Sequence, residues 1–149
     1  MGKYSIKDLE QLSGIKAHTI RIWEKRYTLI NPQRTETNIR FYSDHDLQKI
    51  INVAQLNNHG YKISRIAEMS EHELTQKVLE LSETENDKSL HIDQLILAMI
   101  NLDEEKFETA RSGFFMRYNF EQTITDIVYP FLEKTGVLWL TKNITPAQE

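Results

Sequence analysis

The chain has 149 residues, 40% of them hydrophobic and 27% charged, which allows one domain or two small ones. It contains no cysteine, which excludes disulfides and thiolate metal sites. The sequence shows neither a signal-peptide core nor an apolar run of membrane-spanning length. We therefore expect a cytoplasmic protein with no membrane partner.

The charge is divided unevenly along the chain. Residues 1–70 contain 11 Lys and Arg against 7 Asp and Glu, a net charge of +4, whereas residues 71–149 contain 7 against 15, a net charge of -8. A basic half followed by an acidic half suggests a nucleic-acid module joined to a different unit. Chance also produces such a charge imbalance in a short chain, so the assignment of a nucleic-acid module depends on the sequence motifs.

The first part of the chain has the pattern of two short helices joined by a turn. Ser5 is placed to cap a helix over residues 6–12, Gly14 supplies a turn, and a second helix is expected over residues 16–27. The side chains of this second helix that we expect in the core are Ile20, Ile22 and Trp23. Two helices separated by a short turn with glycine are the helix-turn-helix signature.

A short β-hairpin is predicted after the second helix. Pro32 ends the helical region, and residues 33–42 are polar and then alternate with apolar side chains, which predicts a two-strand wing with its turn near Glu36–Asn38. Ser43 then opens another helix, with Asp46 at the N3 position of a capping box. Gly60 ends that helix, and two shorter helices follow before residue 81.

Residues 82–89 are polar and unpatterned and are predicted to be a linker. Helices are expected beyond it, at about 90–101, 103–117 and 119–141, with Pro130 kinking or splitting the last. Thr145-Pro146 has the form of a helix start three residues before the last, so we expect a truncated fourth helix and a fragment of a longer protein. The predicted fold is mainly α: a winged helix-turn-helix DNA-binding domain over 1–81, a linker, and an incomplete helical bundle over 90–149.

Duplex DNA is a dense line of negative charge, so a binder needs Lys and Arg on one face. The predicted second helix and wing supply them. The candidate DNA-contacting residues are Lys7, Lys16, His18, Thr19, Arg21, Lys25, Arg26, Tyr27, Arg34, Asn38 and Arg40. His18 and Thr19 lie at the helix start, which usually reaches base edges. A solvated helix face would explain the basic residues too, and Tyr27 either packs under the wing or donates to a phosphate.

Four segments carry a family resemblance: Tyr4-Ser-Ile-Lys-Asp-Leu9, Gly14-Ile15, Thr19-Ile-Arg-Ile-Trp-Glu-Lys-Arg-Tyr27 and Ile39-Arg-Phe-Tyr-Ser43. Over residues 4–69 they resemble the MerR family of bacterial transcription regulators. Many members have two tyrosines where this chain has Ile22-Trp23. The Trp-Glu-Lys-Arg-Tyr form instead resembles the light- and cobalamin-responsive branch, the CarA/CarH/LitR-like repressors.

This resemblance implies a sequence-specific regulator of promoter DNA that forms a homo-oligomer when full length. It also implies an effector half, in which a bundle tryptophan covers adenosylcobalamin and a Glu-His pair follows ten residues later. Trp139 and Glu149 stand at these two positions, although Leu140 replaces a histidine found in some members. The chain ends before the domain that would ligate the cofactor, so we expect no cofactor in this fragment.

An enzyme and an interaction module are the two alternatives to a DNA-binding regulator. The histidines are scattered, and no His-Glu-x-x-His, phosphate loop or Gly-x-Ser-x-Gly motif is present, so we do not expect an enzyme. The alternative is a non-catalytic interaction or adaptor module that uses the helix-turn-helix as a scaffold. Low DNA affinity with tight protein binding would identify it.

Overall fold

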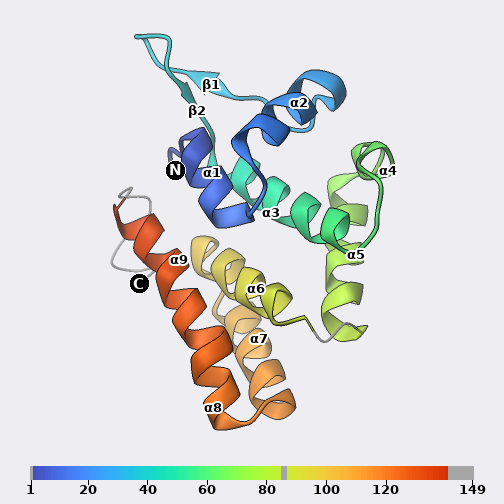
Figure 1. Ribbon diagram of the computed structural model, residues 1–149, viewed down its shortest axis with the longest axis vertical. Helices are drawn as coiled ribbons and strands as arrows, with labels where there is room; N and C mark the ends of the chain where they lie inside the picture. The colour runs from blue at the N-terminus through green and yellow to red at the C-terminus, as the bar shows by residue number, and fades with distance from the viewer. Residues whose placement is uncertain (1, 85–86, 141–149) are drawn as a thin grey trace. The chain divides into compact units, whose positions relative to one another are not determined.

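The computed structural model describes residues 2–84 and 87–140 and divides the chain into two compact units, with the boundary between Leu81 and Ser82 (Figure 1). The elements up to this boundary are α1 (Ile6–Ser13), α2 (Ala17–Tyr27), β1 (Gln33–Arg34), β2 (Arg40–Phe41), α3 (Asp44–Asn58), α4 (Ile63–Ala67) and α5 (Glu71–Thr84), which crosses it. The later elements are α6 (Lys88–Ile100), α7 (Glu104–Arg117), α8 (Phe120–Thr123), the π-helical η1 (Ile124–Val128) and α9 (Tyr129–Leu140). The predicted mainly helical fold, with a helix-turn-helix, a small hairpin and following helices, is confirmed.

Local hydrogen bonds set the turn between α1 and α2. Ser5 and Asp8 form a capping box, in which the Asp8 N–H donates to Ser5 Oγ at 3.2 Å and the Ser5 N–H donates to Asp8 Oδ2 at 2.9 Å. Gly14 follows α1 with φ of 79°, and its N–H donates to the Glu10 carbonyl at 2.9 Å. Glycine adopts this left-handed conformation without a steric cost, so the chain turns directly into α2.

The core of the first unit lies where α1 packs against α2 and α3, and where α3 packs against α4. The fully or almost fully buried side chains on these helices are Leu9, Leu12, Ile20, Trp23, Leu47, Ile50, Ile51, Leu56 and Ile66. Burial of each of these side chains stabilises the folded state by about 1.5–3 kcal/mol. The predicted capping box of α3 is present, with the Asp46 N–H donating to Ser43 Oγ at 3.2 Å.

The wing is an antiparallel hairpin in which Gln33 pairs with Phe41 and Arg34 with Arg40. At its turn the Thr35 N–H donates to the Ile39 carbonyl at 2.9 Å, and Asn38 has a left-handed φ of 64°. The base of the hairpin is extended by Tyr4, whose backbone exchanges hydrogen bonds of 2.9 and 2.8 Å with that of Tyr42. The N-terminal segment and the wing therefore form one support for α2.

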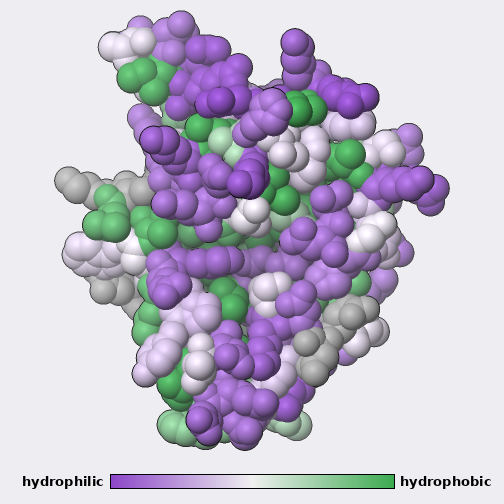
Figure 2. Space-filling model, viewed as in Figure 1, coloured by the Kyte–Doolittle hydropathy of each residue, from purple (hydrophilic) through white to green (hydrophobic). Residues whose placement is uncertain are grey.

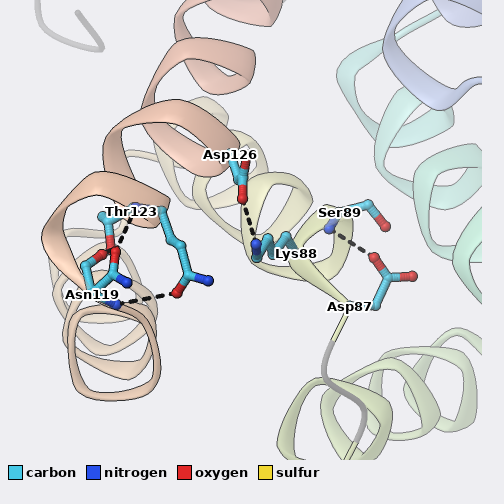
Figure 3. A network of polar contacts seen from close by, with 7 residues as sticks. Asp87, Lys88, Ser89, Asn119, Thr123 and Asp126 are labelled. Atoms are coloured by element: carbon cyan, nitrogen blue, oxygen red, sulfur yellow. Dashed lines mark hydrogen bonds and ion pairs between the residues drawn. The ribbon is translucent and has the colours of Figure 1, made fainter.

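The second unit is built around α6, which packs against α7, η1 and α9. Its buried cluster is formed by Ile92, Leu95, Phe114 and Ile127, with Phe107, Ala110, Tyr118 and Phe131 packed against it. Ion pairs join α6 to the later helices. Lys88 reaches Asp126 in η1 (Figure 3), and Lys134 Nζ in α9 lies 2.8 Å from Asp93 Oδ1.

The predicted linker over residues 82–89 has the wrong bounds. Within the described residues α5 continues to Thr84, and α6 begins at Lys88 with Asp87 accepting from the Ser89 N–H at 2.9 Å. Arg117 of α7 donates to the carbonyls of Ser82 and Glu83 at 3.0 and 3.1 Å. A polar composition does not stop a helix when side chains satisfy the groups at its end.

Pro130 changes the helix type rather than breaking the helix. The turn before it is π-helical, and the Tyr129 N–H donates to the Ile124 carbonyl, five residues earlier. Proline has no N–H and its ring needs room over the preceding turn, which a wider turn provides. The expected helix start at Thr145-Pro146 lies outside the described residues.

Candidate nucleic-acid interface

The two sides of α2 differ sharply in character. Ile20 and Trp23 point into the core and are 0% and 7% exposed. The opposite side carries the exposed side chains His18, Arg21, Ile22, Lys25 and Arg26. The expectation that Ile22 belongs to the core is therefore wrong. The helical period of 3.6 residues explains this, because a position two residues from Ile20 lies on the far side of the helix.

Three of the candidate cations meet in one groove. Arg21 and Lys25 of α2 and Arg40 of β2 line a groove of about 420 Å³. The remaining lining residues are Glu24, Ile30, Asn31 and Pro32. Hydrophilic residues cover most of the wing and α2 at the top of the view in Figure 2. The groove presents positive charge from two elements, as a binder of a phosphate backbone requires.

Glu24 joins α2 to the wing. Its carboxylate accepts a hydrogen bond from the Tyr42 hydroxyl, and its Oε2 lies 3.4 Å from Arg40 Nη1. The Glu24 side chain is 8% exposed, and burial together with this hydrogen bond raises the pKa of Tyr42. Glu24 is therefore a positioning residue that sets the place of β2 relative to α2. Local spacing does not reveal this role, because Tyr42 and Arg40 lie 18 and 16 positions away in the sequence.

The wing residues Arg34 and Asn38 are engaged with each other. Arg34 Nη1 donates to the carbonyl oxygen and to Oδ1 of Asn38, both at 3.1 Å. These bonds brace the left-handed turn at Asn38. Beside them Lys3, which was not among the main candidates, places its ammonium 5.1 Å from the centre of the Phe41 ring. A cation stacked on the wing had no signal in the sequence, because the contact forms between distant segments.

The other candidates occupy different positions around α2. Lys7 is exposed on α1, and Lys16 precedes α2 without a side-chain cap. Thr19 and Tyr27 are half-buried, and the Arg26 guanidinium lies 5.8 Å from the Tyr27 ring centre. The N-cap residue Lys16 provides no side-chain acceptor for the first turn of α2, which is the positive end of the helix dipole.

Of the two residues expected to contact a cofactor, Trp139 and Glu149, the described residues include Trp139. Trp139 is 58% exposed on α9, which also carries the exposed side chains of Tyr129, Leu132 and Leu140. Glu149 lies outside the described residues. In the described part of the chain, His, Asp and Glu side chains form no cluster of three or more that would hold a metal ion. Helices long and apolar enough to cross a membrane are likewise absent from residues 2–84 and 87–140.

Known proteins match the segment that contains this interface. A family described as "MerR HTH family regulatory protein" matches residues 4–73. The transcriptional repressor CarH of Myxococcus xanthus is 33% identical over 66 residues, which are 44% of this chain and 22% of that protein. The transcriptional regulator MlrA of Escherichia coli strain K12 is 32% identical over 66 residues, 44% of this chain and 27% of that protein.

The transcriptional activator mta of Bacillus subtilis strain 168 is 30% identical over 71 residues, 47% of this chain and 27% of that protein. The matched segments thus span about a quarter of the length of these relatives, which are by name a repressor, a regulator and an activator. The family match over residues 4–73 contains α1, α2 and the wing. Residues 4–73 form a helix-turn-helix domain of the MerR family.

Proposed function

We propose that this chain is a sequence-specific double-stranded DNA-binding regulator of transcription. In this proposal α2 enters the major groove and the wing contacts the neighbouring backbone. The observation that carries it is the groove between α2 and β2, where Arg21, Lys25 and Arg40 come together. The named relatives, all transcription regulators, support the same assignment. Adjacent copies would bind repeated half-sites, with DNA deformability contributing to specificity.

Fluorescence anisotropy with duplex pools at about 50 and 200 mM salt, followed by sequencing of the bound fraction, tests this proposal. We expect affinity to fall steeply with salt and a repeated half-site to be enriched. Weak, salt-insensitive binding with no enriched sequence would contradict it. Tight binding to a protein in place of DNA would favour the adaptor alternative, in which the helix-turn-helix is a scaffold.

For the second unit we propose, from the family resemblance, a sensory role in which Trp139 packs against adenosylcobalamin. The exposed apolar side chains of Tyr129, Leu132, Trp139 and Leu140 on α9 support this proposal, because a flat ring system binds to such a surface. Titration of the full-length protein with adenosylcobalamin in the dark, followed by tryptophan fluorescence, tests it, because this fragment alone is expected to bind no cofactor. Trp23 is buried in the first unit, so we expect quenching in the wild type and little in Trp139→Phe. Equal quenching in both proteins would contradict the role of Trp139.

A further inference from the structure

Ile22 is the apolar side chain on the exposed face of α2. It is 38% exposed, while Ile20 and Trp23 on the opposite side are 0% and 7% exposed. His18 lies one turn before it on the same face, and Lys25 and Arg26 lie one turn after it. A β-branched side chain has few rotamers in a helix, so the backbone fixes where its methyl groups lie.

A helix in the major groove meets a defined set of chemical groups. The base edges there present hydrogen-bond donors and acceptors, and the 5-methyl group of thymine is their apolar group. Isoleucine has no hydrogen-bonding group. Placed against a polar base edge, it would displace water without replacing the lost hydrogen bonds, which carries a free-energy cost. Placed against a methyl group, it buries apolar surface on both partners.

Resting on the proposed DNA-binding function, we infer that Ile22 is a specificity residue that recognises the 5-methyl group of a thymine in the operator. Isolated exposed apolar side chains are common on protein surfaces. The position of Ile22 distinguishes it from these, because charged and polar side chains that suit phosphates and base edges surround it. Arg21, Lys25 and Arg26 would hold the helix against the groove while Ile22 contacts the base.

The test begins with the duplex that the wild-type chain selects from the pool. Each thymine is replaced in turn by deoxyuridine, which lacks only the 5-methyl group. We expect one replacement to weaken wild-type binding about threefold to fivefold, the change expected for one buried methyl group. Ile22→Ala should bind the thymine and deoxyuridine duplexes equally at that position. Ile22→Val, which keeps the β-branch, should retain part of the difference.

Ile39→Ala is the matched control. Ile39 is also an exposed isoleucine, 63% accessible, but it lies on the wing. Its removal should leave the difference between thymine and deoxyuridine intact. Equal wild-type binding to all the deoxyuridine duplexes, or a difference that survives in Ile22→Ala, would overturn the inference while the regulator assignment stands. Failure of the wild type to select any sequence would overturn both.

Discussion

The Tyr4 hydroxyl donates to Asp44 Oδ1 at 2.6 Å and so ties the start of the chain to the first residue of α3, 40 positions later. The Gly2 N–H donates to the second oxygen of the same carboxylate at 3.1 Å. Burial opposes ionisation of Asp44, but hydrogen bonds from its donors, Tyr4 among them, hold its pKa below the usual value. This pair, together with the backbone bridge from Tyr4 to Tyr42, anchors the base of the wing.

Tyr4→Phe should destabilise the chain by about 1–2 kcal/mol, because it removes a hydrogen bond to a charged acceptor. The measurement is the midpoint of urea denaturation. A Cβ at Gly2 would lie 2.5 Å from Asp44 Oδ1 and 2.7 Å from the Tyr4 hydroxyl, so Gly2→Ala should displace the same pair. The double variant should lose less than the sum of the two single losses. Strict additivity would show that the two residues do not act on one network.

Glu24→Gln should strengthen binding to non-specific duplex DNA about twofold to fivefold at low salt, because it removes a negative charge beside the groove. The amide can still accept from the Tyr42 hydroxyl, so the wing should keep its place. Anisotropy over a salt series measures the effect. Tyr42→Phe is the control, since it removes the hydrogen bond and keeps the charge, and it should give no such gain. Weaker binding by Glu24→Gln would show that the positioning role of Glu24 outweighs its charge.

Arg21→Ala and Lys25→Ala should affect DNA binding in different ways. If Arg21 reads a base edge, its loss should cost about 1–3 kcal/mol on the selected duplex and relax specificity at one position. If Lys25 meets phosphate, its loss should weaken binding to all sequences and flatten the dependence on salt. Parallel titrations of selected and scrambled duplexes separate the two effects. If both variants bind DNA with wild-type affinity, α2 does not enter the major groove of the DNA.

The ion pair between Asp93 and Lys134 should make the effects of mutating these two residues on the free energy of unfolding strongly non-additive. The Asp93 side chain is 5% exposed and that of Lys134 is 27% exposed. Lys134→Met would leave a buried carboxylate without this partner. It should lower the free energy of unfolding by about 2–3 kcal/mol, less than for most fully buried pairs because Lys134 is partly exposed. Replacing both, as Asp93→Leu with Lys134→Met, should recover much of the loss. Denaturation of the four proteins of the cycle measures the coupling, and an equally unstable double variant would contradict it.

The stability of the second unit should fall as the pH falls below about 6.5. Burial, and then the nearby Arg117 guanidinium, lower the pKa of His91, while Asp87 opposes them. The unfolded chain therefore takes up a proton at a higher pH than the folded chain, so stability is lost as the pH drops. His91 is 6% exposed, its Nε2 has no hydrogen-bond partner in the described residues, and Tyr118 lies edge-on at 5.9 Å.

His91→Phe should flatten this pH dependence, because it keeps an aromatic ring in the site and removes the titrating group. Thermal melts at about pH 7.5 and 5.5 compare the variant with the wild type across the titration of an ordinary histidine. His72→Gln is the control, because His72 is exposed and the pH dependence should survive its loss. An unchanged slope in His91→Phe would assign the pH dependence to other groups.

The sequence alone determined the local structure of the first unit. The helix caps at Ser5 and Ser43, the turn at Gly14 and the alternation before Tyr42 depend on neighbours within a few residues, so their positions could be predicted. The exposed face of α2 also follows from helical spacing, which places Ile22 on that face although its hydrophobicity favours the core. The bounds of the linker failed because Arg117, a distant residue, supports the end of α5.

Tertiary structure alone decided which side chains act together. Arg21, Lys25 and Arg40 share a groove because β2 returns beside α2, and Glu24 meets Tyr42 because the hairpin brings residues 18 positions apart into contact. Tyr4 meets Asp44, and Asp93 meets Lys134, for the same reason. Local periodicity carries no information about such pairs, since they depend on how the elements pack. The composition of the interface could thus be predicted from the sequence, and its geometry required the folded chain.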